Sequence, residues 1–376
     1  MKPLYLCVLG AGASRDAGFP LYRDILDPVY LETLREYLHT HARELLPLRL
    51  DDGLKRLQER CLSFRRDGED LESLLNQYMS ANPEKAKDLL SYYSLLIRSA
   101  DNLFNSHGTP NYLVLGLVPI LVAMARAARV AVLSFNHDLL IELSFASQKD
   151  RAIFFSYYLD RNRTSHLSDV WVPQGDPFIY WPSETFFKRP ADIERCSPIP
   201  LLKLHGSFNW LQCTRCEAIL VERVDLDDVV AKIVCPKCKG AFRLGIVPPK
   251  RVKQIEGFAS TWTCAKQLVR DARLVTFIGY SLPEYDEDAL RLFRENLRED
   301  AAIVVIAGNI SPEMKTRYEK LAGKRRIEFF SIGLIDFLSG LLGGSDEMSA
   351  YRGLLYHHFC TMLECDPGLP RRLYSV

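Results

Sequence analysis

Residues 4–20 read LYLCVLGAGASRDAGFP, an apolar run that leads directly into closely spaced glycines. The run 4–9 has the length and composition of a strand that is buried on both faces in a parallel sheet. Glycines after such a strand let the backbone approach a pyrophosphate, which amide N–H groups and the N-terminus of the next helix would bind. A tight turn by itself explains Gly10 and Gly12, but it does not require Ser14 as well. A side chain at position 12 is therefore expected to fill the phosphate position and to leave the fold intact.

Further apolar runs predict more buried strands, and several are followed by stretches with helical spacing. The predicted strands are residues 129–135, 200–205, 273–278, 302–307 and 326–331, and the predicted helices include 22–38, 111–125, 287–297 and 312–321. Buried strands that alternate with helices predict an α/β fold, a Rossmann-like doubly wound parallel sheet.

The length of 376 residues allows one large domain with insertions or two domains. We expect this domain to span residues 1–335 and to bind a dinucleotide at the C-terminal ends of its strands. Residues 39–111 are charged and leucine-rich, without strand-like alternation, which predicts a helical insertion. Residues 336–376 predict a helical C-terminal tail with an aromatic end.

Four of the ten cysteines form two C-x-x-C pairs, Cys213 with Cys216 and Cys235 with Cys238. This spacing is typical of a closed, structural zinc site with tetrahedral ligands, so we interpret residues 212–242 as an inserted zinc ribbon. A redox-active pair is the less favoured alternative, because two pairs occur together. Thiols at metal spacing, with other cysteines scattered along the chain, indicate a reducing compartment and thus the cytoplasm.

Charge and hydropathy exclude some partners. Lysine and arginine number 48 and aspartate and glutamate 47, which leaves a net charge of +1 and no general attraction to nucleic acid or to anionic membranes. The apolar stretch at 113–124 is shorter than the roughly 18 residues of a membrane span. The first residues lack a convincing cleavage site for a signal peptide.

Polar motifs follow several of the predicted strands. The segments are Ser134-Phe-Asn136-His-Asp138, Leu204-His205-Gly-Ser, Gly279-Tyr-Ser281-Leu and, after the run 302–307, Asn309. A histidine suits general-base chemistry because its unperturbed pKa of about 6.5 leaves neutral imidazole near neutral pH. For the segment 134–138 the alternative is an Asx turn that caps the next helix.

In their order along the chain, these motifs resemble those of sirtuins. The sirtuin opening pattern, G-A-G-x-S, then G-I-P, then an aromatic residue and an arginine, is matched at Gly10, Ala11, Gly12, Ser14, Gly18, Pro20, Tyr22 and Arg23. The segment 134–138 resembles T-Q-N-x-D with Phe135 in place of the glutamine, and 279–282 resembles G-T-S-L. Cys213 follows His205 as sirtuin cysteines follow their histidine.

The resemblance implies roles for individual residues. It makes His205 the general base, lets Asn136 hold the ribose or the attacking water, and lets Asp138 accept hydrogen bonds from the nicotinamide carboxamide. It implies that NAD, as the substrate, is contacted by Gly10, Ala11, Gly12, Ser14, Pro20, Tyr22, Arg23, Asn136, Gly279, Ser281 and Asn309.

One departure bears on the activity. Sirtuin deacylases carry a peptide-pairing strand after the second cysteine pair, whereas this chain continues with Pro248 and Pro249, which lack the backbone donors of an added strand. With the helical insertion and the Pro-Glu-Tyr-Asp286 continuation of the last glycine motif, this resembles a divergent, mostly bacterial sirtuin-like branch. Members of that branch often hydrolyse NAD and serve in anti-phage defence.

The favoured activity is therefore hydrolysis of the nicotinamide–ribose bond of NAD. An NAD-dependent protein-lysine deacylase and a non-catalytic sensor of NAD or ADP-ribose remain alternatives. A dehydrogenase is disfavoured because the third glycine of G-x-G-x-x-G is missing: it falls at Gly18, after Arg15. The sequence leaves open a homo-oligomer or a separately encoded protein partner.

Overall fold

The computed structural model describes residues 4–15, 19, 21, 117–146, 153–158, 164–165, 179–180, 197–221, 234–235, 237–246 and 258–342. The predicted helix at 22–38, the predicted insertion at 39–111 and the tail after residue 342 lie outside these residues. So do Pro20, Tyr22, Arg23, Pro248 and Pro249.

The larger of two sheets has eight strands, all parallel except for one at its edge. In spatial order they are β12 (Ile327–Ser331), β11 (Ala302–Ala307), β10 (Ala272–Ile278), β1 (Leu4–Leu9), β2 (Arg129–Ser134), β6 (Ser197–Lys203), β3 (Ile153–Tyr158) and the antiparallel β5 (Ile179–Tyr180). Every side chain of β1 is buried, as the continuous apolar run predicts for a central strand.

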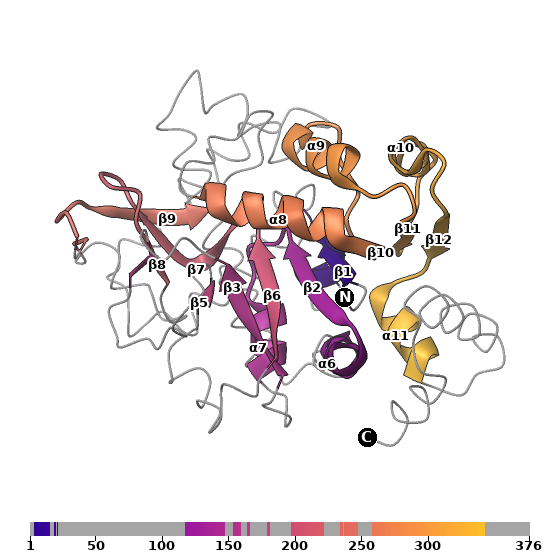
Figure 1. Ribbon diagram of the computed structural model, residues 1–376, viewed down its shortest axis with the longest axis horizontal. Helices are drawn as coiled ribbons and strands as arrows, with labels where there is room; N and C mark the ends of the chain where they lie inside the picture. Colours follow the sequence, from indigo (N-terminus) through magenta and orange to yellow (C-terminus); the bar gives the residue numbers. More distant parts are fainter. Residues whose placement is uncertain are drawn as a thin grey trace, which may run out of the picture.

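The strand order reverses beside β1. The chain passes from β1 to β2 and on to β3, and then returns with β6 between β2 and β3. Later it continues on the other side of β1 with β10, β11 and β12. This arrangement is that of a doubly wound Rossmann-type sheet, in which ligands bind outside the carboxyl ends of the strands at the reversal point. The predicted fold class is confirmed, and the reversal point lies between β1 and β10 (Figure 1).

The predicted strand limits agree with the structure at β1 and β11 and differ by a residue at β2, β10 and β12. The prediction for 200–205 was wrong at both ends. β6 begins at Ser197 and ends at Lys203, because Leu204 and His205 form a turn into the next strand.

Helices connect the strands of the larger sheet. They are α1 (Gly12–Arg15), α6 (Val118–Ala127), α7 (Leu140–Ala146), α8 (Ala259–Asp271), α9 (Glu287–Asn296), α10 (Pro312–Ala322) and α11 (Leu334–Leu342). Within the predicted helix at 111–125, α6 begins at Val118, and α11 begins two residues before the predicted tail at 336–376. The N-cap residues of α9 and α10 are Asp286 and Ser311, whose side chains accept hydrogen bonds from the amides of Ala289 and Met314.

The sequence analysis did not predict α8, which crosses the sheet in Figure 1 and contacts β1, β3, β6 and β10. Trp262, Ala265 and Val269 recur at helical spacing and are buried. The Trp262 indole donates a hydrogen bond of 3.2 Å to the carbonyl of Leu204. α8 therefore fastens the turn that carries His205.

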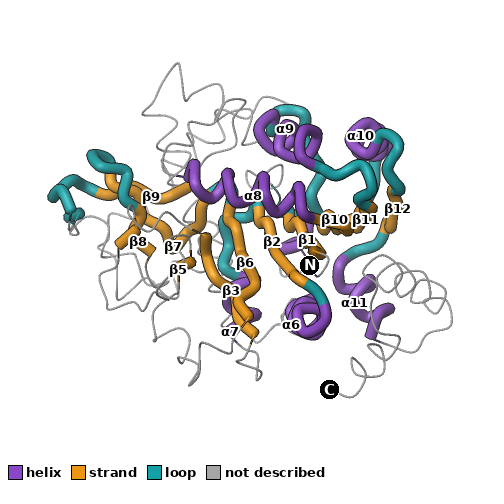
Figure 2. The backbone as a smooth tube through the Cα atoms, in the orientation of Figure 1, coloured by secondary structure: helices purple, strands orange, loops and turns teal. Residues whose placement is uncertain are grey.

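The four paired cysteines lie in and beside the strands of the smaller sheet. Figure 2 shows the course of these strands. Its strands lie in the order β4 (Thr164–Ser165), β8 (Ile219–Val221), β7 (Gly206–Cys213) and β9 (Phe242–Ile246), with β7 antiparallel to both neighbours. A search of the described residues for a helix with the length and hydropathy of a membrane span found none.

The loops after β1 and β10 touch backbone to backbone. The amide of Gly10 donates to the carbonyl of Ile278 over 3.0 Å, and the amide of Gly12 donates to the carbonyl of Gly279 over 2.8 Å. A Cβ atom at Gly12 would lie 2.8 Å from the Cα of Gly279, and one at Gly279 would lie 2.1 Å from the amide nitrogen of Ala13. We call this contact of Gly10, Gly12 and Gly279 the glycine clamp.

The clamp corrects the expectation for a side chain at position 12. Such a side chain would strike the backbone of Gly279 rather than only fill a phosphate position, so Gly12→Val is expected to disturb the fold itself. A loss of NAD affinity in Gly12→Val would therefore not by itself show that Gly12 contacts the phosphates of NAD.

The contribution of the clamp to stability can be tested by comparing substitutions at Gly279 and Gly323. Both have a left-handed φ, +60° and +59°, but a Cβ at Gly323 meets nothing within 4 Å. We expect Gly323→Ala to cost about 1–3 kcal/mol from conformation alone, because its φ of 59° and ψ of −111° lie in a sparsely populated backbone region. Gly279→Ala should cost clearly more, because its added Cβ also meets the backbone of Gly12 and Ala13. Urea unfolding followed by circular dichroism measures both, and equal losses would show that the close approach contributes nothing.

Candidate functional site

The motifs predicted after β1 and β2 form one buried hydrogen-bond network. The side-chain amide of Asn136 donates to the carbonyl of Gly10 and to Oγ of Ser14, each over 2.9 Å. The Ser14 hydroxyl donates to Oδ2 of Asp138 over 2.8 Å. Four of the predicted site residues are thus held together at the carboxyl ends of neighbouring strands.

Asp138 serves the helix and the site at once. Its Oδ1 accepts a hydrogen bond of 3.1 Å from the amide of Leu140, the first residue of α7, while Oδ2 receives the Ser14 hydroxyl. The Asx-turn interpretation of this segment is correct, and it does not compete with a site role. The carboxylate is 8% exposed, so its orientation is set by these donors.

The amides of the glycine-rich loop are engaged within the protein. Gly12 donates to Gly279, Ala13 to the carbonyl of Gly10 over 2.9 Å, and Ser14 to the carbonyl of Ala11 over 3.1 Å. The loop amides that were expected to meet a pyrophosphate therefore stabilise the turn and the clamp in this structure.

His205 lies in the turn between β6 and β7 and is almost fully buried. Its Nε2 lies 3.3 Å from Oδ2 of Asp286, and its ring meets the edge of Phe135 with the centroids 5.0 Å apart. The same Asp286 oxygen accepts a hydrogen bond of 2.9 Å from the Tyr280 hydroxyl.

Asp286 was not among the predicted site residues. The sequence analysis noted it only as part of the Pro-Glu-Tyr-Asp continuation. A local signal was present, since an aspartate before a helical stretch is typical of an N-cap. No local signal shows that the capping carboxylate also faces a histidine from another strand.

The aromatic rings of Phe135 and Tyr280 stack on each other. They occupy the positions at which this chain departs from the T-Q-N-x-D and G-T-S-L patterns, and their rings stack with centroids 4.3 Å apart and 5° between planes. The two departures are thus one packing feature that joins the loops after β2 and β10.

The remaining predicted contacts lie on the β10 and β11 side. Gly279 belongs to the glycine clamp, and Ser281 is exposed while its carbonyl accepts a hydrogen bond of 3.1 Å from Arg317. Asn309 is exposed after the end of β11. These residues follow β10 and β11 at the same sheet edge as the buried network.

A buried ion pair contacts the loop that contains Asp138. Nζ of Lys203 lies 3.1 Å from Oε1 of Glu142 and also donates to the carbonyl of Asp138, and the two side chains are 0% and 4% exposed. Lys203 therefore joins β6, α7 and the loop between β2 and α7. The sequence analysis missed this pair, because a lysine that ends a strand reads as exposed.

The paired cysteines form two knuckles with the same backbone pattern. In the first, Cys213 donates its amide to Ala218 and accepts from Glu217; in the second, Cys235 donates to Gly240 and accepts from Lys239. Glu217 and Lys239 occupy the same place in each knuckle, and both have a positive φ, 59° and 60°.

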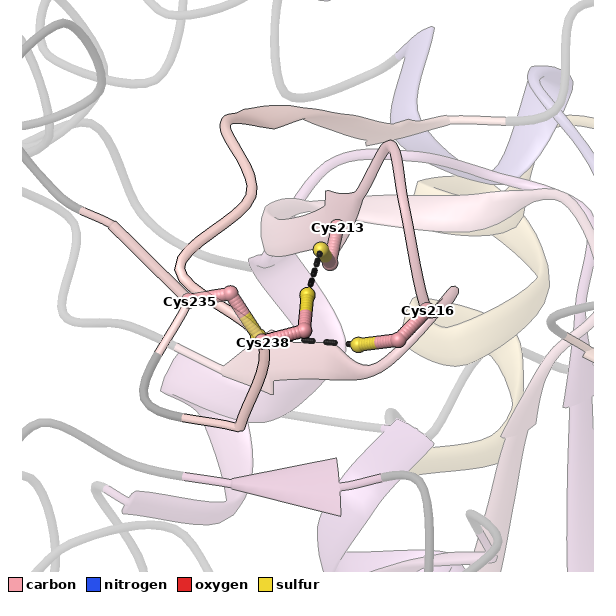
Figure 3. A group of neighbouring side chains, drawn as sticks. All are labelled: Cys213, Cys216, Cys235 and Cys238. Atoms are coloured by element: carbon pink, nitrogen blue, oxygen red, sulfur yellow. Dashed lines mark hydrogen bonds between the residues drawn. The ribbon is translucent and has the colours of Figure 1, made fainter.

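The four sulfur atoms turn toward one another (Figure 3). All lie within 4.8 Å, with Cys213 and Cys238 at 3.4 Å and Cys216 and Cys235 at 3.6 Å. A tetrahedron with Zn–S bonds of about 2.3 Å has edges of about 3.8 Å, so these thiols fit a structural zinc ion.

Amide groups around the first knuckle favour thiolate. Burial raises the pKa of Cys213, but hydrogen bonds from the amides of Cys216 and Arg215 and from neighbouring thiols lower it to about 7. For Cys216 the amide of Ala218 lowers the pKa, yet burial and the neighbouring thiols raise it to about 12. A cation at the centre would favour the thiolate form of its ligands.

The buried pair makes a prediction about stability. Lys203→Met should lower the free energy of unfolding by about 3–5 kcal/mol, because the buried carboxylate of Glu142 loses the cation that lies 3.1 Å from it. The double variant Lys203→Met with Glu142→Leu should recover much of that loss. Urea unfolding of the wild type and these variants measures the coupling, and additive losses would contradict it.

The knuckles predict one zinc ion per chain, measurable by elemental analysis of freshly purified protein. Cys235→Ser should lose zinc and stability together, since ligand binding and folding of a ribbon are coupled.

Gly240 offers a finer test than removal of a ligand. An added Cβ there would lie 3.0 Å and 3.3 Å from the sulfurs of Cys213 and Cys238. Gly240→Ala should weaken zinc retention against a chelator by about 10- to 100-fold. The matched control is Ala218→Gly at the equivalent place of the other knuckle. Zinc retention in Gly240→Ala equal to that in wild type would contradict this prediction.

Comparison with known proteins found no matching family model and no matching curated protein. Among solved structures, the chain is similar to a mutant Sir2 homologue in complex with 2'-O-acetyl ADP ribose, with 14% identity, 94% of each chain covered and a TM-score of 0.46. It is similar to a Sir2 homologue–NAD complex, with 15% identity, 94% of this chain and 91% of that chain covered and a TM-score of 0.44. For Sir2Tm bound to a propionylated peptide, the values are 14%, 91%, 92% and 0.39. The chain is thus similar to Sir2 structures over nearly its whole length.

Proposed function

We propose that this chain is a sirtuin-superfamily enzyme that hydrolyses the nicotinamide–ribose bond of NAD to nicotinamide and ADP-ribose. The observation that carries the proposal is convergence. Asn136, Asp138 and His205 follow two different parallel strands, and the fold brings them to the edge at which the strand order reverses. Dinucleotides bind at that edge in doubly wound sheets.

The reaction places modest demands on the protein. Nicotinamide leaves NAD as a neutral base from a cationic ring, so its departure needs no acid. The enzyme must hold the ribose in a dry site and supply water to the oxocarbenium-like centre. We assign His205 to accept the proton of that water, and Asn136 and Asp138 to hold the ribose and the carboxamide.

The network around Asn136 supports this assignment. Its amide nitrogen is committed to Gly10 and Ser14, which orients the amide oxygen away from those two groups. A group fixed in this way loses little conformational entropy when substrate binds. Preorganised polar groups in a buried site are what a charged transition state requires.

A protein-lysine deacylase is the second candidate, because one feature favours it. β9 is the last strand of the smaller sheet and pairs only with β7 among the described strands, so it has an edge to which an extended peptide could add. Pro248 and Pro249 follow two residues after its end and disfavour such pairing. Hydrolysis of NAD without a peptide is therefore the better-supported activity.

The resemblance to the divergent bacterial branch extends the proposal to the biological setting. We propose a cytoplasmic enzyme of anti-phage defence that acts with a homo-oligomeric or separately encoded partner. An increase in NAD loss during phage infection of cells that express the chain, absent from cells with a His205 variant, would support this role.

The direct test is incubation of purified protein with NAD, with and without an acetylated peptide, while nicotinamide and ADP-ribose are measured. Wild type should release both without peptide. His205→Ala should lower the rate by about 100- to 10,000-fold, the usual loss of a general base, while still binding NAD. His137→Gln is the matched control, since it alters the neighbouring histidine and should retain activity.

The contrary result is specific. If nicotinamide appears only with the acylated peptide, together with deacylated peptide and an acyl-ADP-ribose, the deacylase is the correct activity. NAD binding without turnover in both conditions would indicate a sensor.

A further inference from the structure

Asp286 occupies a position that its role as a helix cap does not explain. It precedes α9, and its Oδ1 accepts the amide of Ala289 over 3.4 Å, as an N-cap should. Its Oδ2 instead faces Nε2 of His205 over 3.3 Å. The two side chains are 3% and 5% exposed, so the charge of this carboxylate acts on the imidazole with little screening by water.

The carboxylate is held by a second donor. The Tyr280 hydroxyl donates to the same Oδ2 over 2.9 Å, and the Tyr280 carbonyl accepts a hydrogen bond of 2.7 Å from Tyr318. The intervening loop contains a buried Leu282 with a φ of 50°, a left-handed conformation that a leucine rarely adopts. This conformation occurs in the loop that leads from Tyr280 to Asp286.

The imidazole is held from its other side. The edge of Phe135 meets the His205 ring at 76°, and Phe135 stacks on Tyr280, which in turn binds Asp286. The contacts form a closed circuit of His205, Phe135, Tyr280 and Asp286. The titratable groups around the imidazole include Asp286, Tyr280 through that carboxylate, and His137, whose ring lies 6.1 Å away.

We infer that Asp286 is the positioning residue of His205. The Asp286 carboxylate accepts the Nε2–H of His205, so that Nδ1 is the atom that accepts a proton. This inference rests on the proposed hydrolysis of NAD. As the ribose–nicotinamide bond breaks, its electron pair leaves with nicotinamide and a water oxygen bonds to the ribose carbon. The water proton passes to Nδ1, and the resulting imidazolium is stabilised by Asp286 until it releases a proton to solvent.

Asp286→Asn tests the role because asparagine caps a helix about as well as aspartate but carries no charge. The variant should fold and bind NAD with an unchanged KM, while kcat falls at least about 10-fold, as a part of what the general base contributes. A neighbouring negative charge favours imidazolium, so its removal should move the acid limb of the pH–rate profile to lower pH. Tyr280→Phe, which keeps the stacked ring, should change kcat in the same direction by less.

Ser311→Asn at the start of α10 is the matched control, because it exchanges an N-cap residue far from the histidine. It should leave kcat and the pH profile as in wild type. An acid limb in Asp286→Asn that coincides with that of wild type would overturn the inference and reduce Asp286 to a helix cap.

A second measurement needs no activity. Proton–nitrogen NMR of protein with labelled histidine, with His205→Gln to assign the signal, reports the tautomer and the titration of His205. We expect the Nε2–H tautomer in wild type and a titration at lower pH in Asp286→Asn. An Nδ1–H tautomer in wild type would sink the assignment. If these NMR results hold while wild type releases no nicotinamide, the proposed hydrolysis fails and the histidine–aspartate pair stands.

Discussion

The close approach of Gly10 and Gly12 to Gly279 is the constraint on which the rest of the site depends. It joins the loops after β1 and β10, the two strands between which the strand order reverses. A side chain at Gly12 or Gly279 would push these loops apart and would move the network that follows β1 away from Tyr280 and the loop to Asp286. The glycines thus hold the two loops of the site in contact, and any contact with the phosphates of a ligand would be an additional role.

Buried polar groups around the clamp satisfy one another across strands. Asn136 binds the carbonyl of Gly10, Asp138 receives Ser14, and Lys203 pairs with Glu142 beneath them. Because an unsatisfied buried polar group is costly, each such bond fixes the relative position of two loops. The same demand that stabilises the fold therefore preorganises the groups to which we assign the chemistry.

The zinc ribbon and the proposed base share a strand. β7 begins at Gly206, directly after His205, and ends at Cys213, the first thiol of the four-cysteine cluster. Metal bound at the knuckles would stabilise one end of β7, and the hydrogen bond from Trp262 to Leu204 holds the other. A structural metal distant from the reaction would in this way contribute to the position of the histidine.

The sequence by itself indicated six strands of the larger sheet, the strand-to-helix turns and the cysteine ribbon, because hydrophobic runs, glycines and ligand spacing are local signals. It also brought Asn136, Asp138 and His205 to notice as motifs. It did not reveal α8, nor the Lys203–Glu142 pair, nor the contact of Asp286 with His205. Those depend on which strands become neighbours and on which side chains lose their water, and only the tertiary structure decides that.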